Sequence, residues 1–135
     1  MATKVLDSWA LMALFRDEPC ADAVEALLAK AASTDQHFLL STVNWGEIYY
    51  SVYRADGQEA AEQKAHEIAS LPIEVVGVGE DLALVRQAAI FKATCKMSYA
   101  DCFAAALAKL RNAELVTGDP EFKAVEKEIK VAWLV

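Results

Sequence analysis

Short apolar runs alternate with longer amphipathic stretches along most of this chain. Five short runs have the length and composition of strands, at 4–7, 38–40, 73–76, 114–116 and 131–134. Apolar residues recur with a helical period between these runs, which predicts helices at 9–15, 21–32, 43–54, 59–70, 80–94 and 98–108, and a short helix after Pro120. This alternation predicts an α/β fold in which helices cover both faces of a parallel sheet.

The predicted helix at 98–108 is apolar on nearly every side, which is typical of a helix buried against a sheet. Ser98 is a suitable N-cap for it. Asp101 lies in line with Ala104 and Ala108, on the face with the smallest side chains, and a charge buried there requires a partner. Ser98 and Asp101 also have the spacing of a capping box, worth ~1 kcal/mol. Asp101 is therefore either a buried charge with a functional partner or a helix-capping residue, and both interpretations stay open until other carboxylates are located near it.

Two further carboxylates follow predicted strands. Asp7 ends the first strand, and Asp119 comes directly after the fourth. Ligands of open parallel sheets bind beyond the carboxyl ends of the strands, and a right-handed crossover brings the start of the 98–108 helix toward the same edge. Capping explains the same two residues equally well, because each precedes a helix and Asp119 is followed by Pro120.

Glu47 is the fourth candidate and the one that periodicity supports least. The helix at 43–54 has its main apolar face around Ile48 and Val52, and Glu47 lies opposite, with Asn44. A helical wheel therefore favours a solvent-exposed glutamate, although a polar metal cleft suits the same face.

Length and composition predict one domain, 1–135, with a core of its own. No apolar run approaches the ~18 residues of a membrane span, and Lys4 is followed by a short strand rather than by a signal sequence. The three cysteines form no C-x-x-C pair, which is typical of reduced thiols. We therefore expect a cytoplasmic protein that does not contact membranes.

The net charge of −7 argues against a nucleic-acid partner unless the carboxylates converge on divalent cations. Two carboxylates ~4 Å apart repel each other by ~4 kcal/mol at an effective dielectric constant of 20. Hard cations remove this repulsion, and a site made only of oxygen ligands suits Mg²⁺ or Mn²⁺. Both ions commonly serve phosphate chemistry.

Four segments occur in an order that resembles the PIN-domain nucleases, and most closely the VapC-type toxins of toxin–antitoxin pairs. The segments are Val5-Leu6-Asp7-Ser8, Val43-Asn44-Trp45-Gly46-Glu47-Ile48, Ser98-Tyr99-Ala100-Asp101 and Thr117-Gly118-Asp119-Pro120-Glu121-Phe122. The resemblance covers nearly the whole chain. It implies a three-layer α/β/α sandwich with a mainly parallel central sheet. It also implies one or two Mg²⁺ or Mn²⁺ ions bound by an acidic quartet, here Asp7, Glu47, Asp101 and Asp119.

The implied activity is metal-dependent endonucleolytic hydrolysis of RNA, which leaves a 5′-phosphate and a 3′-hydroxyl. Asp7 and Asp101 would bind metal directly, and Glu47 and Asp119 through water. Residues expected to orient these ligands are Ser8, Asn44 and Thr117, and candidates for contacts with RNA phosphates are Arg16, Lys92 and Lys96. The resemblance also implies a cognate antitoxin, whose C-terminal segment lies across the cleft, and a homodimer.

Trp9 departs from the family pattern, because many relatives carry a small hydroxyl or amide residue two positions after the first aspartate. A polar contact near the metal is therefore either missing or supplied by Ser8. The same tryptophan argues against a phosphatase of the haloacid dehalogenase type, which requires a second aspartate there. The remaining alternative is a catalytically degenerate PIN module that binds RNA or a protein partner without cleavage. Metal binding distinguishes this module from a nuclease.

Overall fold

The computed structural model describes residues 3–80 and 82–135. The strands among these residues form one five-stranded sheet. The strands are β1 (Lys4–Leu6), β2 (Phe38–Ser41), β3 (Ile73–Val76), β4 (Glu114–Thr117) and β5 (Val131–Trp133). All neighbouring strands are parallel, in the order β3-β2-β1-β4-β5. The bounds of each strand agree, to within one or two residues, with those of the apolar run that predicted it.

The helices also follow the predicted pattern. They are α1 (Ser8–Phe15), α2 (Ala21–Ser33), α3 (Thr42–Asp56), α4 (Gln58–Ser70), α5 (Ala83–Thr94) and α6 (Tyr99–Leu110), with a 3-10 helix, η1, at Pro120–Val125. Gly57 separates α3 from α4 with a φ of 95°, a conformation that glycine adopts without steric cost. The helix predicted at 80–94 begins later than expected, at Ala83, and residue 81 lies outside the described residues.

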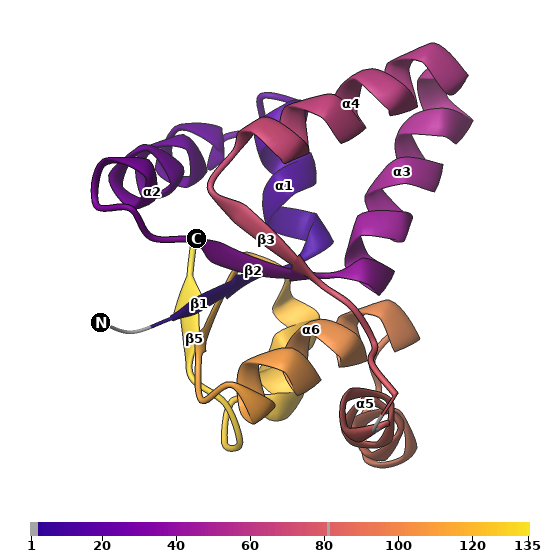
Figure 1. Cartoon of the computed structure of the whole chain (residues 1–135). Coiled ribbons are helices and arrows are strands. Elements are labelled where there is room, and N and C mark those ends of the chain that lie inside the picture. The colour runs from indigo at the N-terminus through magenta and orange to yellow at the C-terminus, as the bar shows by residue number, and fades with distance from the viewer. Residues whose placement is uncertain (1–2, 81) are drawn as a thin grey trace.

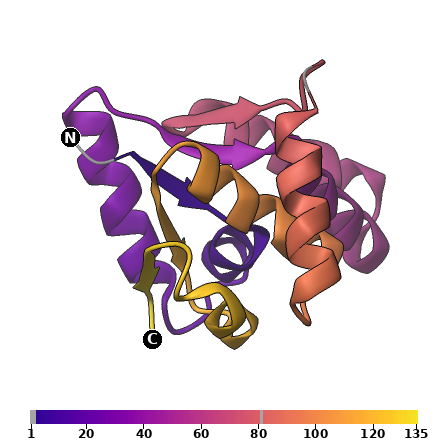
Figure 2. The ribbon, with the colours of Figure 1, turned by 90° about the horizontal axis from the view of Figure 1, so that it is seen from below.

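Helices cover both faces of the sheet, so the predicted three-layer α/β/α sandwich is confirmed (Figure 1). Side chains alternate along each strand, and neighbouring residues therefore enter different cores. The residues that pack with α1 to α4 include Leu6, Leu40 and Val116, and those that pack with α5 and α6 include Val5, Leu39 and Leu115. Figure 2 shows α6 lying against the sheet with α5 beside it. Consistent with this central place, Asp101 to Ala108 are all buried.

The strand order reverses at β1. From β1 the chain continues through β2 to β3 on one side of the sheet, and it then returns to place β4 on the other side of β1. Ligand sites of open α/β sheets form beyond the carboxyl ends of the strands at such a reversal. Asp7 follows β1 and Asp119 lies two residues beyond β4, so both stand at this point. None of the helices in residues 3–80 and 82–135 is long and apolar enough to cross a membrane.

Candidate metal centre

Asp7 is completely buried at the junction of β1 and α1. One carboxylate oxygen caps α1 by accepting a hydrogen bond from the Ala10 backbone N–H at 2.9 Å, as the capping interpretation predicted. The other oxygen accepts a 2.6 Å hydrogen bond from the Thr117 hydroxyl, across the β1–β4 pair. Burial raises the pKa of Asp7 to about 7, although both hydrogen bonds oppose the shift. Capping explains only part of the environment of this carboxylate.

Asp101 occupies the first turn of α6, and only 5 % of its surface is exposed. Its backbone N–H donates to the Ser98 hydroxyl at 3.2 Å, so Ser98 is the N-cap that the sequence predicted. Among the described residues no hydrogen bond to the Asp101 carboxylate is recorded. Burial, and after it the charges of Asp119, Asp7, Glu121 and Glu47, together raise the pKa of Asp101 to about 7. Within residues 3–80 and 82–135, the carboxylate therefore lies among like charges and accepts no recorded hydrogen bond.

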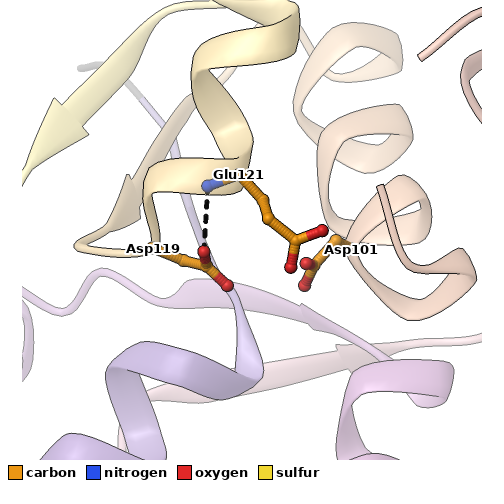
Figure 3. A group of neighbouring side chains, drawn as sticks. All are labelled: Asp101, Asp119 and Glu121. Carbon is orange, nitrogen blue, oxygen red and sulfur yellow. Dashed lines mark hydrogen bonds between the residues drawn. The ribbon is translucent and has the colours of Figure 1, made fainter. Parts of the chain in front are cut away.

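Asp119 and Glu121 complete a compact group with Asp101. One oxygen from each of the three carboxylates lies within 4.8 Å of the others, and Figure 3 shows the side chains converging from η1 and α6. Asp119 also caps η1 by accepting a 2.9 Å hydrogen bond from the Glu121 N–H. Glu121 is exposed and was not predicted as a site residue. Its place in the first turn after Asp119 and Pro120 was the available signal, because it fixes Glu121 close to Asp119.

Glu47 faces the same region from α3, contrary to the exposure that its helical wheel favoured. It is half-buried, accepts a hydrogen bond from the Ser8 hydroxyl, and is close enough to Asp101 to raise the pKa of that residue. Both α1 and α6 pack against α3, so the polar stripe of α3 meets other helices. The wheel identified the stripe correctly but could not show what covers it.

The three residues expected to orient the acidic side chains all form hydrogen bonds beside them. Ser8 donates to Glu47, and Thr117 donates to Asp7 while accepting from the Asp119 N–H at 3.0 Å. Asn44 is fully buried and donates to the Ala100 carbonyl at 3.1 Å. That bond fixes the start of α6 directly before Asp101.

The chemistry of this donor set fits a hard divalent cation. Within residues 3–80 and 82–135, the ion pairs are Lys4–Glu114, Lys64–Glu67 and Lys109–Glu128, and none of them includes a carboxylate of the group. The group offers only oxygen ligands, and Asp101 within it and the neighbouring Asp7 are desolvated enough to hold protons near neutral pH. Mg²⁺ and Mn²⁺ prefer such ligands and would offset the mutual repulsion.

The three cations predicted to contact RNA occupy different surroundings. Arg16 follows the last residue of α1, and the eight-residue helix sets it ~12 Å from the Asp7 end. Lys92 donates to the Met97 carbonyl at 2.8 Å and so supports the connection between α5 and α6. Lys96 is exposed in that connection, where it lines an open hollow together with Glu121. Of the three, Lys96 is both close to the acidic group and without a recorded bond in the described part of the chain.

Comparison with known proteins gives a consistent result. The sequence model of the PIN domain family matches residues 4–128. DNA-bound VapBC from Salmonella typhimurium has a TM-score of 0.74 at 17 % identity, with 100 % of both chains covered. A toxin–antitoxin complex from Klebsiella pneumoniae has a TM-score of 0.72 at 17 % identity, with 98 % of both chains covered. VapC20 from Mycobacterium tuberculosis, a sarcin–ricin loop cleaving toxin, has a TM-score of 0.72 at 21 % identity, with 91 % of this chain and 95 % of that chain covered. No curated protein matches the chain in sequence.

Proposed function

This chain belongs to the PIN domain family, and from that premise we propose that it is a Mg²⁺- or Mn²⁺-dependent endoribonuclease, the toxin of a toxin–antitoxin pair. The observation that carries the proposal is the convergence of carboxylates at the carboxyl edge of the sheet without a cationic side chain bonded to them in the described residues. The proposed metal-binding and catalytic residues are Asp7, Glu47, Asp101 and Asp119. Glu121 stands at the exposed rim of the same group and is a further candidate ligand.

The carboxylates of the proposed quartet are proposed to place their negatively charged oxygens around one cation site. Asp7 and Asp101 are assigned to direct contact with metal, because they are the two buried members of the proposed quartet and a cation would offset the cost of burying their charges. Thr117 fixes the orientation of Asp7, and Ser8 fixes that of Glu47. When bound, a divalent cation lowers the pKa of water and stabilises the charge on the leaving oxygen of a phosphodiester. Neutralising these carboxylates also allows an RNA phosphate to approach a chain whose net charge is −7.

A cognate antitoxin and a homodimer are part of the proposal. Support for the antitoxin comes from the similar structures: one is a toxin–antitoxin complex and another, VapC20, is a toxin that cleaves the sarcin–ricin loop. The homodimer is proposed from the family resemblance alone. The antitoxin is proposed to lay its C-terminal segment across the acidic edge of the sheet, where it would deny RNA access to Asp101.

Cleavage of total cellular RNA tests the proposal directly. The purified, antitoxin-free protein is expected to produce discrete fragments with 5′-phosphate ends in Mg²⁺ or Mn²⁺, because the carboxylates require cations to accept a phosphate. Chelator is expected to abolish the fragments, and end mapping would identify the RNA. Intact RNA with either metal, from folded protein shown to be free of inhibitor, would contradict the proposal and favour the module that binds without cleavage.

Lys96→Ala is expected to raise KM for an RNA substrate with little change in kcat. Lys96 is exposed and lines a hollow with Glu121 rather than with the buried carboxylates, so it would contact a flanking phosphate and not the reacting one. Removing one phosphate contact reduces the slope of log affinity against log salt concentration by ~1. Lys127→Ala is the matched control, because Lys127 is also exposed but lines a hollow with Asn112, near the start of β4. Equal effects of the two substitutions would contradict this assignment.

A further inference from the structure

The indole of Trp9 occupies the space that a side chain at position 118 would need. A Cβ atom added to Gly118 would lie 2.3 Å from Cη2 and 2.5 Å from Cζ3 of Trp9. Gly118 is buried, and it is not among the described glycines with a positive φ, Gly57 and Gly79. Its backbone therefore does not require glycine. Glycine is required at position 118 because the Trp9 indole fills the space beside it, so the sizes of the side chains at positions 9 and 118 are complementary.

Gly118 lies in the middle of the turn that carries Asp119 into the acidic group. Thr117 ties this turn to the sheet on one side, because its hydroxyl bonds both Asp7 and the Asp119 N–H and its carbonyl accepts from the Leu134 N–H at 2.9 Å. Trp9 reaches the turn from the first turn of α1, directly after Asp7 and Ser8. The turn is thus held by hydrogen bonds from the sheet and by a rigid aromatic ring from α1.

We propose that Trp9 is a positioning residue, which acts through Gly118 to set the place of the Asp119 carboxylate relative to Asp101 and Asp7. The inference rests on the proposed metal-dependent function. Trp9 makes no recorded hydrogen bond to any of the described acidic side chains, so it acts by shape. Ser8, its neighbour, supplies the polar contact of this segment by donating to Glu47. Division of the two tasks between adjacent residues explains why a bulky apolar side chain is accommodated beside an acidic site.

The test compares Trp9→Ala, Gly118→Ala and the double variant by Mn²⁺ calorimetry, at a temperature where circular dichroism shows each protein to be folded. Each single substitution is expected to weaken Mn²⁺ binding by about 10–100-fold, the range found when residues that support metal ligands are changed. A methyl group at position 118 must displace either the indole or the turn, and both movements undo the packing. The double variant is expected to bind Mn²⁺ about as well as either single variant, because the two changes remove one contact.

Trp133→Ala is the control for loss of an indole outside the acidic group. Trp133 is half-buried on β5, and its Nε1–H donates to Glu126 at 3.0 Å. It is expected to lower the Tm without changing Mn²⁺ affinity. A spectroscopic test needs no metal: with Trp45→Phe and Trp133→Phe in place, adding Gly118→Ala is expected to shift the emission of Trp9 as its packing changes. Trp9→Leu replaces Trp9→Ala if the latter does not fold.

The outcomes separate this inference from the proposed function. Wild-type affinity in the Trp9 and Gly118 variants, with binding lost in Asp101→Asn, would overturn the positioning role and leave the metal site intact. Strictly additive effects in the double variant would also overturn it. Failure of the wild-type protein to bind Mn²⁺ would overturn the proposed function and the positioning role together.

Discussion

Replacing Asp101 by asparagine is expected to reduce metal-dependent RNA cleavage by more than about a hundredfold while leaving the metal-free protein at least as stable as wild type. Changes to residues that only support metal ligands cost about 10–100-fold in activity, and loss of a ligand should cost more. The stability result has a different cause. At pH 8 the wild-type side chain is ionised although it is 5 % exposed and close to other carboxylates, and the amide removes that buried charge. Cleavage rates and the Tm in chelator measure the two effects.

Asp22→Asn is the matched control for this substitution. Asp22 lies in the first turn of α2, as Asp101 does in α6, and it is exposed. Both substitutions remove a favourable interaction with a helix dipole, worth ~0.3–1 kcal/mol, but only Asp101→Asn also relieves a buried charge. A large loss of stability in metal-free Asp101→Asn would show that the side chain serves mainly as a cap. Undiminished cleavage would remove Asp101 from the proposed ligands.

The order of strands and helices was predictable because the buried elements of this chain have a distinctly apolar composition. β1 and β4 are short runs covered on both faces, and α6 is apolar all round, so each has a composition that a less buried element would not carry. Composition did not show which strands lie next to β1, since Leu39 and Leu115 are similar apolar residues that pair with Val5 from either side. The position of the ligand-binding edge therefore followed from general rules for parallel sheets rather than from any one residue.

The sequence indicated some of the acidic residues more clearly than others, and the reason differs from one residue to the next. Asp7 directly follows β1 and Asp119 lies two residues beyond β4, and the end of a strand has a defined place in the fold. Glu47 lies on a helix whose polar stripe is indistinguishable in sequence from a solvated one, and only the packing of α1 and α6 against α3 turns it inward. Glu121 is exposed, so burial leaves no signal for it. Trp9 was predicted to leave a polar contact near the metal either missing or supplied by Ser8, and in the structure Ser8 donates to Glu47 while Gly118 makes room for the indole.

The pH dependence of stability is expected to reverse the usual behaviour of carboxylates that form ion pairs. Burial raises the pKa values of Asp7 and Asp101 from 3.8 to about 7, so between these pH values the folded state holds protons that the unfolded state has released. Stability must then fall as pH rises from about 4 to about 7, because the folded state binds more protons. In chelator, the Tm is therefore expected to decline from pH 5 to pH 8. A Tm that rises over this range would contradict the burial of these charges.

Addition of Mn²⁺ at pH 8 is expected to restore the stability that deprotonation removes. A ligand that binds only the folded state at a hundred times its Kd stabilises it by ~2.7 kcal/mol, which corresponds to about 10 °C in Tm for a domain of this size. At pH 5 the gain is expected to be much smaller, because protons compete for the oxygens of Asp7 and Asp101. Asp101→Asn should show both a shallower decline in chelator and a smaller gain with Mn²⁺. An equal gain in that variant would mean that the cation stabilises the fold from another place, and the proposed centre would then lose its main energetic argument.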